Sequence, residues 1–285
     1  MASARNSSEV FAPGVLDGRV ALVTGGGTGL GRASALELAR CGARVLVVGR
    51  RAEVLEAAVE EIRGRGGEAE WASGDVREPA DTRRLVGEAL ARFGRLDTLV
   101  NNAGGQFFSP AELIAAKGWR AVWRLNVEGS LNMAQAAFEL AMEPAGEGMV
   151  VNVTLSPHHG MPGMAHSGAA RAAVEALTRE LAEQWRAAGV AVTAVAAGHF
   201  DTEVLAKYPE SVRAGASRTV PLQRLGTVAE HAWLVALLAS PLGRAFDGST
   251  ITLDGARDNW CGPWPPPGLA DEAGEVPVEE RKAAV

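Results

Sequence analysis

Short apolar runs rich in Val, Leu and Ala recur along the chain, and longer segments with helically spaced apolar residues lie between them. The short runs are typical of strands buried on both faces, and the longer segments of amphipathic helices. Their regular alternation predicts an α/β fold: a single-domain, Rossmann-type, doubly wound parallel sheet with helices on both faces. The predicted strands are 19–24, 44–48, 68–71, 96–100, 149–153, 190–196 and 249–253, and the predicted helices are 32–41, 52–63, 79–93, 117–138, 168–188 and 229–238.

The first predicted strand runs directly into a glycine-rich turn, which reads Thr24-Gly25-Gly26-Gly27-Thr28-Gly29-Leu30-Gly31, and a predicted helix follows. Glycines at this place let the backbone turn sharply and let a diphosphate approach closely, while the helix N-terminus offers free N–H groups to the phosphates. The turn therefore favours dinucleotide binding. Glycines alone are also compatible with a tight turn that binds nothing.

The second predicted strand ends in Gly49-Arg50-Arg51 and carries no acid there. A carboxylate at this end of the strand would bind the ribose 2′-hydroxyl and select NAD. Two guanidinium groups would instead bind a 2′-phosphate, so the sequence favours NADP. The alternative is that one or both arginines are solvated surface charges.

Composition narrows the range of partners. The 285 residues carry a formal net charge of −6, which argues against nucleic acid or an anionic membrane as a partner. The two cysteines, Cys41 and Cys261, are far apart and indicate neither a disulfide framework nor a metal site. Without a long apolar span or a signal-peptide core, we expect a cytoplasmic protein that binds no metal.

The glycine spacing resembles the cofactor loop of the short-chain dehydrogenase/reductase family. Asp75-Val76 and Asn101-Asn102-Ala103-Gly104 resemble later elements of that family in the right order, and the resemblance covers about 17–256. It implies a flexible arm (1–16), a dinucleotide-binding catalytic domain (17–256) and a Pro/Trp-rich tail (257–285). It also implies a homodimer or homotetramer built on helices 117–138 and 168–188. The implied cofactor-binding residues are Gly25, Thr28, Gly29, Leu30, Gly31, Arg50, Arg51, Asp75, Val76, Asn102, Ala103, Gly104, Arg171 and Thr202.

The catalytic positions depart from the family pattern, which is Asn, Ser, Tyr and Lys. Asn126 matches the Asn position and Thr154 the Ser position. Ser167 stands where the proton-transferring Tyr is expected, and Arg171 stands one helical turn later where Lys is expected. The only tyrosine, Tyr208, lies elsewhere. This pattern argues against the usual tyrosine-based alcohol–ketone chemistry.

A serine at the Tyr position is similar to the 2,4-dienoyl-CoA and trans-2-enoyl-CoA reductase branch of the family. The strings that carry this likeness are 104–112, 117–122, 166–171 and 258–260. The branch implies reduction of the C=C bond of an enoyl thioester, with Asn126 and Ser167 donating hydrogen bonds to the developing enolate oxygen. Arg171 would hold the nicotinamide ribose, since a guanidinium stays protonated.

The final proton has several candidate sources. Water is one, and a histidine, which titrates near neutrality, is another. His158 is the histidine that we include among the catalytic residues, with His159, His166 and Ser156 as further candidates. Each histidine has the alternative of a structural role. For the whole chain the alternatives are a carbonyl or imine reductase of a biosynthetic pathway, or a cofactor-binding scaffold without turnover.

Overall fold

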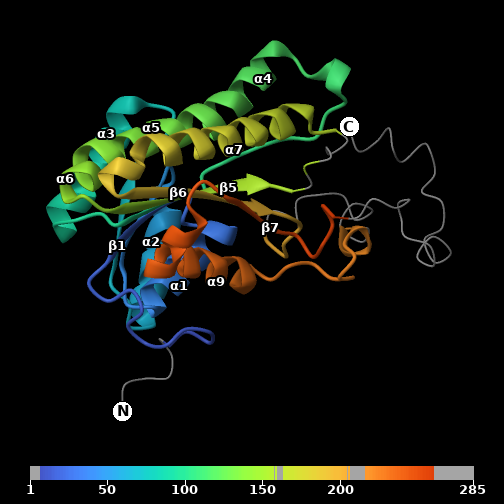
Figure 1. Cartoon of the computed structure of the whole chain (residues 1–285). Coiled ribbons are helices and arrows are strands. Elements are labelled where there is room, and N and C mark those ends of the chain that lie inside the picture. Colours follow the sequence, from blue (N-terminus) through green and yellow to red (C-terminus); the bar gives the residue numbers. More distant parts are fainter. Residues whose placement is uncertain (1–6, 157, 159–162, 204, 206–215, 260–285) are drawn as a thin grey trace.

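The computed structural model describes residues 7–156, 158, 163–203, 205 and 216–259, and shows one parallel sheet at the centre of the molecule (Figure 1). Within these residues the sheet has seven strands in the order β3-β2-β1-β4-β5-β6-β7, which confirms the predicted α/β fold. The strands are β1 (Val20–Thr24), β2 (Arg44–Gly49), β3 (Ala69–Ser73), β4 (Thr98–Asn101), β5 (Gly148–Leu155), β6 (Val190–Ala197) and β7 (Thr250–Leu253).

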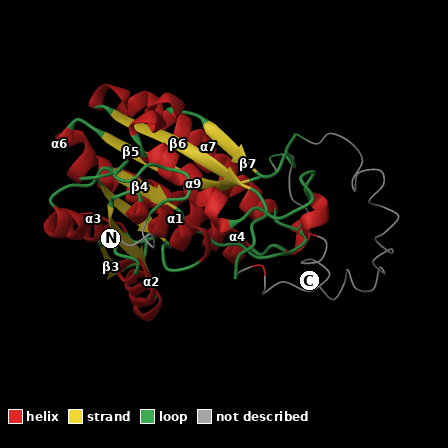
Figure 2. Cartoon of the chain, turned by 90° about the horizontal axis from the view of Figure 1, so that it is seen from below, coloured by secondary structure: helices red, strands yellow, loops and turns green. Residues whose placement is uncertain are grey.

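Helices cover both faces of the sheet (Figures 1 and 2). One face packs against α1 (Gly29–Arg40), α2 (Ala52–Gly64) and α9 (Val228–Ala239). The other face packs against α3 (Pro79–Phe93), α5 (Gly129–Ala137) and α7 (Ala165–Trp185). Short 3-10 segments connect the larger elements: η2 (Ala111–Leu113), η5 (Arg186–Ala188), η7 (Ser217–Thr219) and η8 (Pro241–Phe246).

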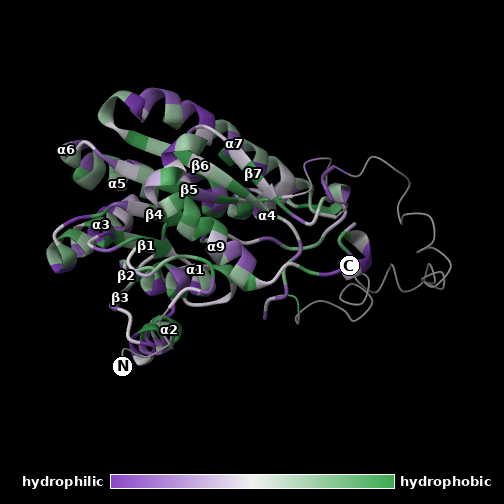
Figure 3. Ribbon diagram, turned by 60° about the horizontal axis from the view of Figure 1, so that its bottom comes forward, coloured by the Kyte–Doolittle hydropathy of each residue, from purple (hydrophilic) through white to green (hydrophobic). Residues whose placement is uncertain are grey.

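β1 shows why the strand sequences are apolar throughout. Val20 and Leu22 pack on the α3–α5–α7 side, whereas Ala21 and Val23 pack on the α1–α2–α9 side. Successive side chains of a strand point to opposite faces, so a strand between two helical layers needs apolar residues at every position. Figure 3 shows the strands mainly in hydrophobic colours.

The long helix predicted at 117–138 is one helical rod interrupted by two π-helical turns. Its parts are α4 (Ala116–Trp123), η3 (Arg124–Glu128), α5, η4 (Phe138–Met142) and α6 (Glu143–Ala145). In η3 the Asn126 side chain donates a hydrogen bond to the carbonyl of Val122 at 2.7 Å. The Ser130 hydroxyl donates to the backbone carbonyl of Asn126 at 2.8 Å. Such π turns commonly mark functional sites.

The described part of the predicted N-terminal arm lies against the domain. Leu16 is buried and its N–H donates to the Cys41 carbonyl at 2.8 Å, and the Ser8 hydroxyl donates to Glu37 on α1. These contacts place residues 7–16 on the α1 side of the sheet rather than apart from it. Residues 260–285 of the predicted tail lie outside the described residues. Among the helices described, none is both long and apolar enough to cross a membrane.

The chain reverses its direction of winding between β1 and β4. β1 pairs with β2 on one side and with β4 on the other, so the loops that leave these strands diverge to opposite faces. In open α/β sheets this reversal opens a crevice at the carboxyl ends of the strands. The topology therefore positions a binding site beside the glycine-rich turn.

Asp97 holds β1 and β4 together at their amino ends. Its buried carboxylate accepts from the Val20 N–H at 2.8 Å, from Arg19 at 2.7 Å and from Arg95 at 2.8 Å. Burial alone would raise the pKa of Asp97, but the hydrogen bonds from Arg95, Arg19 and Val20 outweigh it and lower the pKa. The resulting stabilisation is present above the unfolded pKa of about 3.9 and is lost as pH falls through the lower folded value.

We expect Asp97→Asn to lower the free energy of unfolding at pH 7 by about 1.5–3 kcal/mol, because charge-assisted hydrogen bonds are lost. We also expect the variant to lose less stability than the wild type between pH 5 and pH 2.5. Urea midpoints at pH 7 measure the first effect, and urea midpoints between pH 5 and pH 2.5 measure the second. Glu56→Gln, at an exposed position on α2, is the control. Parallel acid losses in wild type and Asp97→Asn would show that Asp97 is not the titrating contact.

Candidate active site

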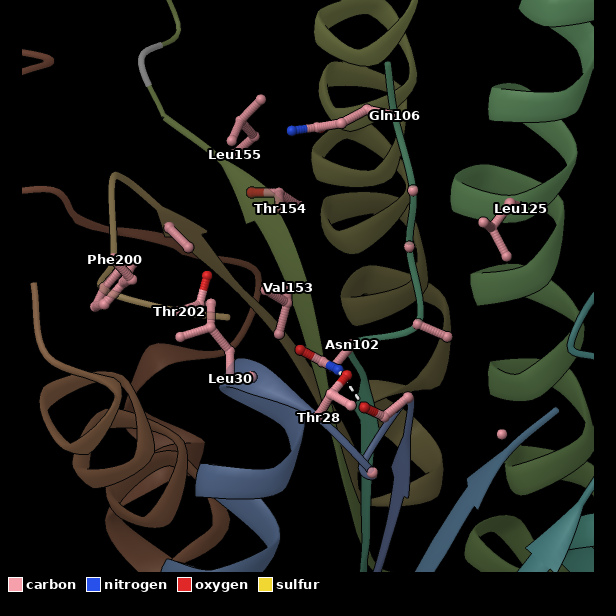
Figure 4. Close-up of a pocket in the computed structure, with 18 of the residues that line it drawn as sticks. Thr28, Leu30, Asn102, Gln106, Leu125, Val153, Thr154, Leu155, Phe200 and Thr202 are labelled. Carbon is pink, nitrogen blue, oxygen red and sulfur yellow. Dashed lines mark hydrogen bonds between the residues drawn. The ribbon is translucent and has the colours of Figure 1, made fainter. Parts of the chain in front are cut away.

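A cleft of about 830 Å³ lies at the carboxyl ends of the strands, within the usual range of ligand pockets. Figure 4 shows residues from several strand ends around it. Thirteen of the fourteen predicted cofactor-binding residues line it: Gly25, Thr28, Gly29, Leu30, Arg50, Arg51, Asp75, Val76, Asn102, Ala103, Gly104, Arg171 and Thr202. The fourteenth, Gly31, does not, because it packs behind the turn. A Cβ on Gly31 would lie 2.5 Å from the Gly25 carbonyl oxygen.

The glycine-rich turn has the geometry that a diphosphate needs. Gly25 and Gly29 have φ values of +63° and +53°, a region that residues with a side chain rarely adopt. Helix α1 begins at Gly29, and the side chain of its N-cap residue, Thr28, makes no capping hydrogen bond. The first N–H groups of α1 are therefore offered to the cleft, where they suit an anion.

The end of the cleft beside β2 carries two arginines and no free acid. Arg50 and Arg51 are exposed at its rim. The carboxylate of Asp75 is already engaged by Arg77, whose Nε lies 2.9 Å from Oδ1. The hydrogen bond from Arg77 is the main reason that the pKa of Asp75 is lowered. This end of the cleft thus suits a phosphate better than a pair of ribose hydroxyls.

Ser167 lies in the first turn of α7, is fully buried and does not line the cleft. Its hydroxyl donates to Oε1 of Gln106 at 2.7 Å. Because the amide oxygen is held from behind, the amide nitrogen of Gln106 points the other way, toward Thr154 and Leu155 across the cleft (Figure 4). The hydrogen-bond donor at this point of the cleft wall is therefore Gln106, with Ser167 behind it.

Asn126 is also fully buried and does not line the cleft. Its amide nitrogen donates to the carbonyls of Gly105 at 2.9 Å and Val122 at 2.7 Å, and its oxygen accepts from the Gly105 N–H at 3.2 Å. Both amide hydrogens are therefore used, so this arrangement leaves none for a substrate oxygen, unlike the expected donor role. The geometry makes Asn126 a clamp on the loop that carries Gln106.

Arg171 brings a positive charge to the middle of the cleft. Its Nη1 donates to the Val153 carbonyl at 2.8 Å, and a Cβ on Gly104 would lie only 2.5 Å from its Nη2. Burial lowers the pKa of Arg171 to about 10, so the guanidinium remains charged at neutral pH. Its buried Nε has no partner among the described residues.

Thr154, which lines the cleft, is connected through hydrogen bonds to His158. The Thr154 hydroxyl donates to Oε1 of Glu175 at 2.8 Å, and Nε2 of His158 lies 2.9 Å from the same oxygen. The other ring nitrogen, Nδ1, is paired with Asp258. Burial disfavours the charged imidazole, but the hydrogen bonds to Asp258 and Glu175 outweigh it and raise the pKa of His158.

The network continues to Asp254. Its Oδ2 accepts from the Asp258 N–H at 2.8 Å and is bonded to the Ser156 hydroxyl. Of the other predicted candidates, His166 is buried against Phe107 with a ring-centroid distance of 4.2 Å, and burial lowers its pKa. His159 and Tyr208 lie outside the described residues. Within the described part of the chain, no group of three or more His, Cys, Asp and Glu side chains is placed to hold a metal ion.

Sequence reasoning missed Gln106, Glu175 and Asp258. In the structure they contact the predicted residues Ser167, Thr154 and His158, respectively. The sequence did indicate where Glu175 would lie, because Glu175 follows Arg171 by one helical turn and therefore shares its face of α7. Gln106 lies in a string that carried the family resemblance, but nothing in the sequence pairs it with Ser167. Asp258 lies in another such string, 258–260, but it is 100 residues from His158 and nothing in the sequence pairs the two.

Comparison with known proteins gives consistent matches. Residues 19–213 match the short chain dehydrogenase family. A probable 2,4-dienoyl-CoA reductase of Bacillus subtilis is 36% identical over 255 residues, covering 88% of this chain and all of the relative. The structure of a citronellol catabolism dehydrogenase of Pseudomonas aeruginosa is 42% identical, with a TM-score of 0.79, covering 89% of this chain and 99% of the other. A gluconate 5-dehydrogenase of Burkholderia cenocepacia, solved with NADP and tartrate, is 32% identical, with a TM-score of 0.80 and coverage of 86% and 97%.

The His158 contacts predict a pH dependence. We expect the pKa of His158 to lie above its ordinary value of about 6.5, and Asp258→Asn to lower it because one carboxylate partner is lost. NMR titration of the imidazole measures this. Since the folded pKa is raised, the stabilisation is present below pH 6.5 and is lost as pH rises through the folded value. The urea midpoint of the variant should therefore change less between pH 6 and pH 9. Asp201→Asn, at an exposed position, is the control, and an unchanged His158 titration in Asp258→Asn would contradict the assignment.

Proposed function

The chain belongs to the short-chain dehydrogenase family, and on that premise we propose that it is an NADPH-dependent reductase of the C=C bond of an enoyl thioester. The observation that carries the proposal is the Ser167–Gln106 hydrogen bond. Where the family pattern has a phenol, this chain has a buried hydroxyl that orients an amide donor. Such a wall suits a reaction that needs stabilisation of an oxyanion more than a strong acid. The name of the Bacillus subtilis relative supports the same substrate class.

The residues of the cleft fit NADP. We propose that the glycine-rich turn and the N-terminus of α1 hold the diphosphate, Arg50 and Arg51 the 2′-phosphate, and Arg171 the nicotinamide ribose. When bound, the cofactor supplies the hydride. The NADP-bound gluconate dehydrogenase neighbour supports this cofactor class.

Hydride addition to the β-carbon of an enoyl thioester moves negative charge onto the thioester oxygen. Stabilisation of that charge by fixed donors is often the largest contribution to such a reaction. We propose that the amide nitrogen of Gln106 is the donor and that Arg171 adds positive potential. Ser167 acts by positioning Gln106, and Asn126 by holding the loop. This revises the direct donor roles expected for Ser167 and Asn126.

The α-carbon then requires a proton. We propose that the Thr154 hydroxyl turns its O–H from Glu175 to the α-carbon and delivers that proton, while a proton from His158 passes through Oε1 of Glu175 to the Thr154 oxygen. One oxygen of Glu175 contacts both neighbours, so a proton leaving His158 Nε2 needs a single carboxylate to reach Thr154. Solvent re-protonates His158, whose side chain is 33% exposed. The overall step adds one hydride and one proton to the C=C bond.

We further propose the assembly and the location that the sequence suggested, namely a homodimer or homotetramer in the cytoplasm. The helices expected to form the interface are the rod that runs from α4 to α6 and helix α7. Phe138 and Trp185 from these two helices stack at a centroid distance of 4.3 Å, which ties the two helices into one surface.

Cofactor choice gives the first test. Arg50→Asp should weaken NADPH binding by about 10- to 100-fold with little change for NADH, because a charge-assisted hydrogen bond is lost and a repelling charge is added. Fluorescence titration measures both affinities. Arg83→Asp, an exposed arginine of α3 outside the cleft, is the matched control. An unchanged ratio of the two affinities in Arg50→Asp would rule out the assignment.

The oxyanion donor gives the second test. Gln106→Leu should lower kcat for a trans-2-enoyl-CoA by about 100- to 1,000-fold with little effect on NADPH affinity, because one fixed donor is removed. Ser167→Ala should lower kcat less, since Gln106 remains but is no longer held. Ser109→Ala is the control on the same loop, where the hydroxyl donates to the Pro110 carbonyl and to nothing else among the described residues. Full turnover in Gln106→Leu would contradict the proposed role.

A further inference from the structure

Arg257 lies in the wall of the cleft and was not among the predicted site residues. It belongs to the segment after β7 and is half-buried. Its Nη1 lies 2.8 Å from Nε2 and 3.1 Å from Nδ1 of His199, which also lines the cleft. Burial and the neighbouring Arg257 lower the pKa of His199 to about 4, so the imidazole is neutral at pH 7 and accepts from the guanidinium.

The guanidinium of Arg257 is therefore hydrogen-bonded to a neutral imidazole, which does not balance its positive charge. Among the described residues, no carboxylate lies within salt-bridge distance of its guanidinium. The nearest acid that acts on it is Asp254, whose Oδ2 already accepts from the Asp258 N–H and the Ser156 hydroxyl. A partly buried cation without an anion is costly, so a ligand that supplied one would offset that cost.

The cleft as a whole also has more positive than negative side chains along its described wall. Among the described residues, its lining contains four arginines (Arg50, Arg51, Arg171 and Arg257) and one acid, Asp75, which is engaged by Arg77. The first three arginines have places in the proposed cofactor site. Arg257 does not, because it follows β7 whereas Arg50 follows β2, five strand spacings away in the sheet. At about 4.8 Å per strand, the ends of β2 and β7 lie roughly 24 Å apart, which separates the two arginines by far more than the width of one phosphate group.

The segment that carries Arg257 reaches the reacting end of the cleft. The next residue, Asp258, is paired with His158, and His158 is joined through Glu175 to Thr154. An anion at Arg257 would thus belong to the part of the substrate that is reduced, rather than to a remote group.

We infer that Arg257, oriented by His199, is a specificity-determining residue that binds a carboxylate on the acyl chain of the substrate. A guanidinium presents its N–H groups as a planar fork that matches a carboxylate. This inference deepens the proposed function and rests on it. The substrate class that follows is an enoyl thioester whose acyl chain ends in, or bears, a carboxylate.

The test compares pairs of trans-2-enoyl-CoA substrates of four to eight acyl carbons, each with either a methyl or a carboxylate terminus. We expect the wild type to prefer the carboxylate member at one or more lengths. Arg257→Met should reduce that preference by about 10- to 100-fold, with NADPH affinity unchanged, because a charge-assisted interaction is lost. Arg257→Lys should retain part of it. Arg83→Met, at an exposed position on α3, is the matched control, and thermal unfolding checks that each variant folds.

A second measurement does not depend on enoyl reduction. Calorimetric titration of the NADP⁺-loaded protein with glutarate and with its neutral diamide should show binding of glutarate alone, and Arg257→Met should abolish it. If no enoyl thioester is reduced but glutarate binding still requires Arg257, the proposed function fails and the anion site stands. Equal losses for both members of each substrate pair would mean that Arg257 binds the phosphates of CoA, and weaker NADPH binding would mean that it belongs to the cofactor site. Either result, or no Arg257-dependent preference in both assays, overturns the inference.

Discussion

The hydroxyl of Thr24 joins the two halves of this structure at the point where the site is built. It donates to the Val100 carbonyl at 3.2 Å and accepts the N–H groups of Asn102 at 3.0 Å and Ala103 at 2.9 Å. The Asn102 amide in turn donates to the Thr24 carbonyl at 3.0 Å. These bonds tie the carboxyl ends of β1 and β4 across the reversal of the sheet. Because the two loops diverge from this point, the cleft opens there and both cofactor-facing segments are positioned by the same few atoms.

The chemistry of the site is arranged in two layers. The residues at the family's catalytic positions are mostly behind the wall: Ser167 and Asn126 are fully buried and contact Gln106 and Gly105. The wall itself presents Gln106, Thr154 and Arg171 to the cleft. At this point of the wall the side chain that reaches the cleft is the amide of Gln106, with the Ser167 hydroxyl behind it. A buried polar group must keep its hydrogen bonds, so the inner layer rigidly orients the outer one.

The charge along the cleft has the opposite sign to the net charge of the whole chain. The chain carries a net charge of −6, but the charged residues that line the cleft in the described part of the chain are four arginines and one engaged acid. Acids collect instead in the network behind the cleft, where Glu175, Asp254 and Asp258 surround His158 and Ser156. This separation makes the charge along the described cleft wall mainly positive and leaves His158 joined to Thr154 through Glu175.

The sequence by itself determined the order of strands and helices along the chain, the family, and thirteen of the residues that line the cleft. Those features depend on local periodicity and on glycines whose backbone conformation is required in place. It also predicted that Ser167 and Arg171 stand in place of the family's usual pair, and this stays a prediction. Only the tertiary structure decided which side chains meet: Ser167 with Gln106, Glu175 with Thr154 and with His158, His158 with Asp258, and Arg257 with His199. The partners in these contacts are between 17 and 100 residues apart in the chain, and one hydrogen bond between two side chains leaves no periodic trace in the sequence.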